Sequence, residues 1–144
     1  MSERMTPEML ASYQQARYVI AFGAGVVIHI GEGNVVPDRL RQEMGDGFGV
    51  MLTAWNPHSV EQPVHVNGQH NEALAQRLRD QGMSFVAAFG EGEGEGATVW
   101  REDGFFVYPW TREQAQRACV TLAQNAVVAL DASGRAELIF HPDL

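Results

Sequence analysis

The order of apolar segments between Phe48 and Asp131 restricts the possible folds of this chain more than any other feature. Apolar runs that read as strands alternate with segments of helical periodicity. The expected strands are residues 48–55, 83–89, 105–110 and 125–131, and the expected helices are residues 67–81 and 111–124. The order strand, helix, strand, strand, helix, strand is that of a split βαβ fold. The sequence therefore predicts an α+β protein with a ferredoxin-like core at residues 48–131. A different mixed sheet with the same element order is the alternative.

Shorter elements flank this core on both sides. Thr6 and Pro7 are a helix start signal, and residues 37–45 have the pattern of a short helix. Two apolar runs separated by Ala24-Gly25 predict an N-terminal β-hairpin, and residues 136–140 predict a C-terminal strand. No repeat or change of composition marks a boundary, so residues 1–144 are expected to form a single α+β domain.

Composition excludes several classes of function. All ten basic residues are arginine, and the formal net charge is −8. The lack of lysine excludes a Walker P-loop and a Schiff-base enzyme. An acidic surface repels phosphate backbones, so no nucleic-acid partner is expected. No apolar window is long enough to span a bilayer and the first ten residues lack an apolar signal core, so we expect a cytoplasmic protein without a membrane partner.

The predicted topology collects polar residues at one edge of the sheet. In a ferredoxin-like core, the ends of the first two strands and the starts of the last two share that edge with the start of the first helix. Loops that follow strands commonly carry ligand sites. The candidate ligand-binding residues at these points are Trp55, Asn56, Asn67, Asn71, Gln124 and Asn125.

Most of these residues also have a structural interpretation. The alternatives are core packing for Trp55, a turn at Asn56, the N-cap of the helix for Asn67, and capping of the preceding helix by Gln124 and Asn125. Asn71 has the weakest structural explanation, because asparagine is a poor helix former. A hydrogen-bonding role is therefore expected for Asn71.

The segment from Phe89 to Phe106 contains five carboxylates and five glycines between two apolar runs. It is expected to be the turn of a β-hairpin. Its glutamates would repel a phosphate, and the spacing of a calcium loop is absent, so no metal and no cofactor are predicted. Glu91 and Glu102 each adjoin a strand and are candidate general bases, since burial at the edge would raise the pKa of a carboxyl group.

Several of these motifs resemble a family of uncharacterised bacterial proteins known as DUF3293. The similar segments are YQQARY, TAWNPHS, NGQHNEAL, GEG, EDGFFVY and QNAVV, spread over residues 13–140. Members often carry an Asp-Pro-Asp-Gly-type stretch and a Glu-Pro-Ser, where this chain has EGEGAT and EDG. The resemblance implies a small bacterial domain and supplies no activity.

Three hypotheses about function follow from the sequence. The favoured one is a module that binds a small polar molecule, such as a nucleoside, an amino acid or an amine, at the amide-rich and carboxylate-lined edge. The second is an enzyme with Glu102 or Glu91 as general base, with or without metal assistance. The third is a protein-interaction domain that binds another chain through Trp100 and Trp110, and it leaves self-association into a homo-oligomer open.

Overall fold

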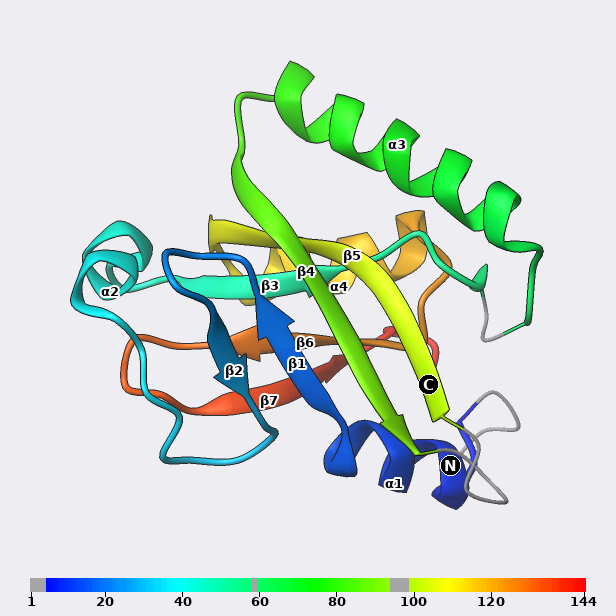
Figure 1. Ribbon diagram of the computed structural model, residues 1–144, viewed down its shortest axis with the longest axis horizontal. Coiled ribbons are helices and arrows are strands. Elements are labelled where there is room, and N and C mark those ends of the chain that lie inside the picture. Colours follow the sequence, from blue (N-terminus) through cyan, green and yellow to red (C-terminus); the bar gives the residue numbers. More distant parts are fainter. Residues whose placement is uncertain (1–4, 58–59, 94–98) are drawn as a thin grey trace.

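The computed structural model describes residues 5–57, 60–93 and 99–144. Within these ranges the chain forms four helices and one seven-stranded sheet (Figure 1). The helices are α1 (Pro7–Gln15), α2 (Asp38–Met44), α3 (Val64–Asp80) and α4 (Arg112–Thr121). The strands are β1 (Arg17–Ile20), β2 (Val26–Ile28), β3 (Phe48–Leu52), β4 (Ser84–Glu93), β5 (Val99–Trp110), β6 (Ala126–Leu130) and β7 (Ala136–Phe140). None of the helices in the described part of the chain is long and apolar enough to cross a membrane.

The sheet has the strand order β2-β1-β4-β5-β3-β6-β7, and all neighbouring strands are antiparallel. The predicted N-terminal hairpin extends the sheet beside β4, and the predicted last strand extends it beside β6. The β4–β5 pair continues to the register Glu93↔Val99, which confirms the predicted hairpin. Residues 94–98, including Glu95 of the acidic stretch, lie outside the described residues.

The sheet curls so that its two edges approach each other (Figure 1). Gly31, which follows β2, exchanges two backbone hydrogen bonds of 2.8 Å with Ala136 at the start of β7. The side chain of Asn34 donates a 2.9 Å hydrogen bond to the carbonyl of Gly134 beside this bridge. The curl gives the sheet a concave face and a convex face.

Each face carries its own apolar core. The concave core contains Tyr18, Ile20, Ile28, Leu40, Phe106 and Leu130, and α2 contributes to it. The convex core contains Leu52, Leu74, Leu78, Val107, Ala115 and Cys119, and α3 and α4 cover it. Side chains alternate between faces along a strand, so Phe106 and Val107 of β5 belong to different cores. The prediction that Cys119 is a core residue is confirmed, since its exposure is 0%.

The ends of the two long helices differ in part from the sequence prediction. The predicted capping box of α4 is present, because Thr111 and Gln114 exchange side chain to backbone hydrogen bonds of 3.1 and 2.8 Å. This helix ends earlier than predicted, at Thr121, because Ala123 takes the left-handed conformation with φ 53°. In α3, the N-cap is Pro63, so the structural interpretation of Asn67 as the N-cap is wrong.

Candidate ligand-binding site

The predicted site residues lie at one end of the sheet, but on two different faces. Asn71 lines a groove on the convex face together with Trp55, Asp103 and Phe105. Glu102 lines a cavity on the concave face. The reason is the alternation of side chains along β5, which turns Glu102 and Asp103 in opposite directions. The structure therefore brings the asparagines together and separates them from Glu102.

Asn71 holds the ends of two strands together. Its Oδ1 accepts a 2.9 Å hydrogen bond from the N–H of Ala54, just after β3. Its Nδ2 donates a 2.7 Å hydrogen bond to the carbonyl of Asp103 in β5. The hydroxyl of Thr53 donates a second 2.7 Å hydrogen bond to this same carbonyl. The hydrogen-bonding role predicted for Asn71 is thus a contact with buried backbone, at a side chain that is 8% exposed.

Asn56 and Asn67 form a second clamp one helical turn away. Asn67 accepts a 2.9 Å hydrogen bond from the N–H of Asn56 and donates one of 2.8 Å to its Oδ1. Asn56 Oδ1 also accepts the N–H of Gln62 at 3.0 Å. Asn56 has φ 45°, a conformation that asparagine tolerates better than most residues. These two amides fold the loop after β3 against α3.

Gln124 and Asn125 lie between α4 and β6, and both are buried. Gln124 Nε2 donates hydrogen bonds to the carbonyl of Trp55 at 3.1 Å and to that of Leu122 at 3.4 Å, near the end of α4. Its side chain also reaches the wall of the concave cavity. The carbonyl of Asn125 accepts the N–H of His141, which ties the start of β6 to the residue after β7. Gln124 is the predicted amide that also lines the cavity of Glu102.

The two candidate carboxylates have different environments. Glu91 forms an ion pair of 3.1 Å with Arg17, and its side chain is 30% exposed. Its neighbour Gly90 is the residue of β4 that pairs with Glu102, so Glu91 lies on the convex side. Glu102 lies beneath α1 on the concave side. Burial, and not an ion pair, is the dominant influence on Glu102.

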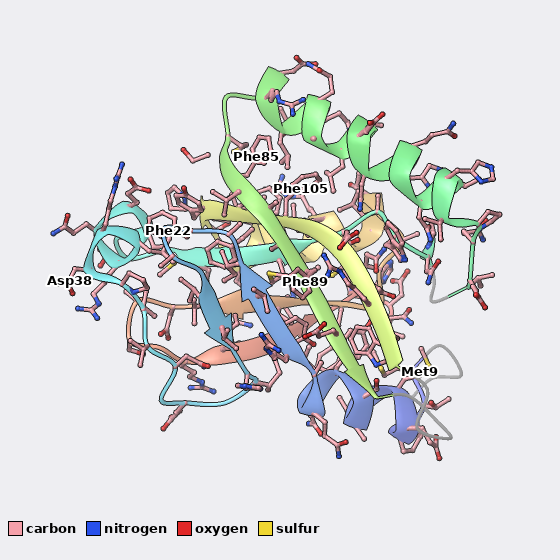
Figure 2. The ribbon with its side chains drawn as sticks, in the orientation of Figure 1. Met9, Phe22, Asp38, Phe85, Phe89 and Phe105 are labelled. Atoms are coloured by element: carbon pink, nitrogen blue, oxygen red, sulfur yellow. The ribbon has the colours of Figure 1, made fainter. Side chains whose placement is uncertain are left out.

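Glu102 lines two adjoining cavities between the sheet and α1. The inner cavity has a volume of about 50 Å³, and its wall includes Tyr13, Tyr18, Trp100 and Gln124. The outer cavity has a volume of about 190 Å³ and is lined by Met9, Ser12, Tyr13, Trp100 and Glu102. Figure 2 labels Met9 on α1, beside the ends of β4 and β5. Helix α1 therefore forms the roof of the site. We call the two spaces together the Glu102 cavity.

Burial changes the ionisation of the groups in the Glu102 cavity. Desolvation raises the pKa of Glu102 from 4.5 to about 7. Desolvation also raises the pKa of Tyr18, and the charges of Tyr13 and Glu102 add to this effect. The Tyr18 hydroxyl donates a 3.0 Å hydrogen bond to the carbonyl of Tyr13. The Tyr18 phenol is thus neutral near pH 7, whereas the Glu102 carboxyl is only partly protonated there.

The described walls of the Glu102 cavity contain no arginine and no histidine. Arg17 pairs with Glu91, and Arg101 pairs with Asp103 at 2.9 Å on the convex side. Arg101 also stacks on the ring of Phe89, 3.8 Å from its centroid. These neighbouring guanidinium groups are therefore engaged elsewhere, and Glu102 has no cationic partner within the described ranges.

Two glycines of β4 make room for the aromatic wall of the Glu102 cavity. A Cβ atom on Gly90 would lie 3.0 Å from the ring of Tyr18, and one on Gly92 would lie 3.2 Å from the indole of Trp100. The indole nitrogen of Trp100 is buried, and no described residue accepts its hydrogen. The GEG segment is thus a surface on which two rings pack, with Glu91 turned to the other face.

Three residues of this ligand site, namely Tyr13, Tyr18 and Trp100, were not identified from the sequence. The signal that could have found part of the wall is strand alternation. Gly90, Gly92, Trp100 and Glu102 occupy alternate positions of two paired strands and so share one face. Tyr13 has no such signal, because it lies on a separate helix.

Trp110 and Trp100 do not form the exposed aromatic surface on which the interaction hypothesis was based. Trp110 is buried in the convex core, where its indole N–H contacts the Met83 sulfur at 3.4 Å. Trp100 is half-buried in the wall of the cavity. The described residues also contain no cluster of three or more His, Cys, Asp or Glu side chains that could hold a metal ion.

The fold and the cavity define a mixed α/β protein with a curled antiparallel sheet and a half-buried carboxyl under a short helix. The family model described as "Protein of unknown function (DUF3293)" matches residues 52–127. The match covers more than half of the 144 residues, so the chain belongs to this family, as its motifs indicated. Comparison with curated proteins and comparison with solved structures gave no match.

The region matched by the family model contains only part of the candidate site. It runs from the end of β3 into β6 and includes the asparagine clamps, Glu102 and Gln124. It does not include α1 or β1, which supply Tyr13 and Tyr18. The family match therefore covers the floor of the Glu102 cavity, whereas its roof comes from the preceding segment.

Proposed function

We propose that this protein binds a small polar molecule in the Glu102 cavity. The observation that carries the proposal is a half-buried carboxyl group, that of Glu102, which has no cationic partner among the described residues and shares the cavity wall with Tyr13, Tyr18 and Trp100. A buried polar group without a partner is costly, so a native protein that keeps one generally has a reason for it. A ligand that donates to Glu102 would remove this cost.

The amides of the predicted edge have a supporting role in this proposal. Asn56, Asn67 and Asn71 form their hydrogen bonds with backbone groups and, between Asn56 and Asn67, with each other. Gln124 adds an amide to the wall of the cavity itself. We therefore propose for the Glu102 cavity the same ligand classes that the sequence suggested for the edge, namely a nucleoside, an amino acid or an amine.

The volume of the cavity limits the size of the ligand. A water molecule occupies about 30 Å³ of liquid, so the outer space of about 190 Å³ has room for about six water-sized groups. An amine or an amino acid fits this space, whereas a nucleoside would have to extend past α1 into solvent.

We further propose that residues 48–131 form a ferredoxin-like core. The support is the contiguous order β4-β5-β3-β6, with α3 and α4 packed in the same convex core. In this topology the ends of β3 and β4 and the starts of β5 and β6 lie at one edge, where the clamps and Glu102 lie.

A second candidate function is catalysis with Glu102 as general acid or base. The specific observation in its favour is the pKa of about 7, which suits proton transfer near neutral pH. Glu91 is the weaker candidate, because its ion pair with Arg17 is largely exposed. The two functions differ in what Glu102→Gln does: catalysis ends while a neutral substrate still binds, whereas ligand recognition through the carboxylate is lost.

The test is a thermal-shift screen of polar metabolites against the wild type, Glu102→Gln and the control Glu91→Gln. We expect one class of compound to raise the Tm of the wild type and of Glu91→Gln, and to lose most of this effect with Glu102→Gln. An absence of any shift in the wild type, or an equal shift in all three proteins, would contradict binding at the Glu102 cavity.

A further inference from the structure

We infer that the ligand of the Glu102 cavity is an organic cation, whose ammonium group lies in the outer space between the Glu102 carboxylate and the rings of Tyr13 and Trp100. This inference rests on the proposed function and names the ligand class for the same site. It is argued from charge, from the aromatic wall and from the size of the cavity.

The first argument is the charge that surrounds Glu102. The elements packed around the carboxyl contribute two titratable side chains, Tyr13 from α1 and Tyr18 from β1. The residues that β3, β4, β6 and their adjoining loops add to the wall carry no charge, as for example Met51, Gly90 and Ala126. None of these described groups is a cation, so within the described ranges no side chain neutralises an ionised Glu102, and a cationic ligand would do so.

The second argument is the aromatic wall. Aromatic rings attract cations through their negative faces, and sites for quaternary ammonium groups are commonly built from several such rings. The rings of Tyr13 and Trp100 line both spaces beside this carboxyl and Tyr18 lines the inner one, and the glycines at positions 90 and 92 leave room for Tyr18 and Trp100. An anion would be repelled by Glu102 and by the net charge of −8, and a neutral molecule would leave the carboxylate uncompensated.

The third argument is the size and access of the outer cavity. Its volume of about 190 Å³ suits a trimethylammonium or small alkylammonium group, and its wall on the side of α1 is formed by Met9, Ser12 and Tyr13. Methionine and tyrosine side chains suit an apolar cation surface, since the charge of an alkylammonium group is shielded by its carbon atoms. The inner cavity of about 50 Å³ is too small for more than one or two water-sized groups.

The experiment compares three probes of matched shape: choline, its neutral analogue 3,3-dimethylbutan-1-ol, and the anion 3,3-dimethylbutanoate. Binding to the wild type is measured by calorimetry or by NMR titration at pH 8. We expect choline to bind at least about tenfold more tightly than the neutral probe, and the anion to bind most weakly. Glu102→Gln should lower choline affinity by about tenfold or more without changing that of the neutral probe, and Glu91→Gln should change neither.

Two further measurements keep the test independent of how well Glu102→Gln folds. Tyr13→Leu on α1 removes one ring and no charge, and should weaken choline about three- to tenfold. Choline carries a permanent charge, so a pH titration of its affinity for the wild type reports the protein alone. The affinity should fall below about pH 7, where Glu102 becomes protonated, by up to about the factor that Glu102→Gln costs, and should level off above it.

The outcomes separate this inference from the proposed function. If the neutral or the anionic probe binds in the cavity as tightly as choline, the cation is the wrong ligand class and the cavity is still a binding site. If choline binds equally well at pH 5 and pH 8, or if Glu91→Gln abolishes its binding while Glu102→Gln does not, the inference is overturned. If no probe and no metabolite binds, both the inference and the proposed function fail.

Discussion

The convex clamp of Asn56, Asn67 and Asn71 and the concave Glu102 cavity are both polar regions withdrawn from solvent at the same end of the sheet, yet their hydrogen bonding differs. In the clamp, the amide side chains pair with backbone groups and with each other at 2.7–3.0 Å. In the cavity, a carboxyl has no cation and an indole N–H has no acceptor among the described residues. A complete set of partners indicates a structural role, and an incomplete set indicates a place for a ligand.

The largest effect is expected from Asn71→Ala. The substitution leaves the N–H of Ala54 and the carbonyl of Asp103 without the amide that pairs with them in the interior. The carbonyl of Asp103 keeps the hydrogen bond from Thr53, so the N–H of Ala54 is the group left without a partner, at about 1–3 kcal/mol, and the lost bond to Asp103 adds about 1 kcal/mol. We expect the free energy of unfolding to fall by about 3 kcal/mol. Urea denaturation measures it, with Gln76→Ala on the exposed face of α3 as the control. Equal losses in the two variants would show that the hydrogen bonds of Asn71 do not stabilise the fold.

The next effect is a stabilisation by Glu102→Gln that depends on pH. The folded-state pKa of Glu102 is raised to about 7 from 4.5, so the folded protein holds this proton more tightly than the unfolded chain. The contribution of Glu102 to stability is therefore favourable at pH 4, falls as pH rises between about 4.5 and 7, and stays unfavourable above pH 7. Glutamine removes the titration, and we expect it to stabilise the protein on the order of 2 kcal/mol at pH 8.

The measurement for Glu102 is a set of denaturation curves from pH 4 to pH 8 for the wild type and Glu102→Gln. The difference between the two proteins isolates this carboxyl from all others that titrate. A difference that is constant with pH would mean that Glu102 is solvated in the free protein, and the contrast between clamp and cavity would then be lost.

A smaller effect is expected from Gly92→Ala. The added methyl group would lie 3.2 Å from the indole of Trp100 and would displace the ring that packs on β4. We expect a loss of about 1 kcal/mol, typical of mild overpacking. Gly68→Ala in α3 is the matched control, because nothing lies within 4 Å of its added methyl group and alanine favours a helix. If Gly92→Ala is as harmless as Gly68→Ala, the aromatic wall is loosely packed.

The smallest effect is expected from Glu91→Gln. Its ion pair with Arg17 is formed by side chains that are 52% and 30% exposed, and exposed pairs contribute little. We expect a change in the free energy of unfolding within about 0.5 kcal/mol at 0.15 M salt, measured beside Glu102→Gln. A larger loss of stability would show that the carboxylate of Glu91, on the convex face, also depends on a specific ion pair in the folded protein.

Local patterns were sufficient for most of the secondary structure. Thr111 and Gln114 predict a capping box because both partners lie within one helical turn, and the structure contains it. Pro37 and Gly45 bracket the short helix α2 for the same reason. Apolar runs also predicted the strands, although α3 begins earlier than predicted, after Pro63, and α4 ends earlier than predicted, before the left-handed Ala123.

The function of the polar residues depended on contacts between distant segments. Asn71 and Glu102 were both assigned from the sequence to one edge, and the choice between clamp and cavity came from the face on which each lies. The chain order shows which residues can cap or pair locally, since those partners are a few positions apart. Burial of Glu102 depends on Tyr13 from α1, on Tyr18 from β1 and on the curl of the sheet, which Gly31 and Ala136 close. This long-range packing lowers the dielectric constant around the carboxyl group and so raises its pKa, and no local sequence pattern encodes that environment.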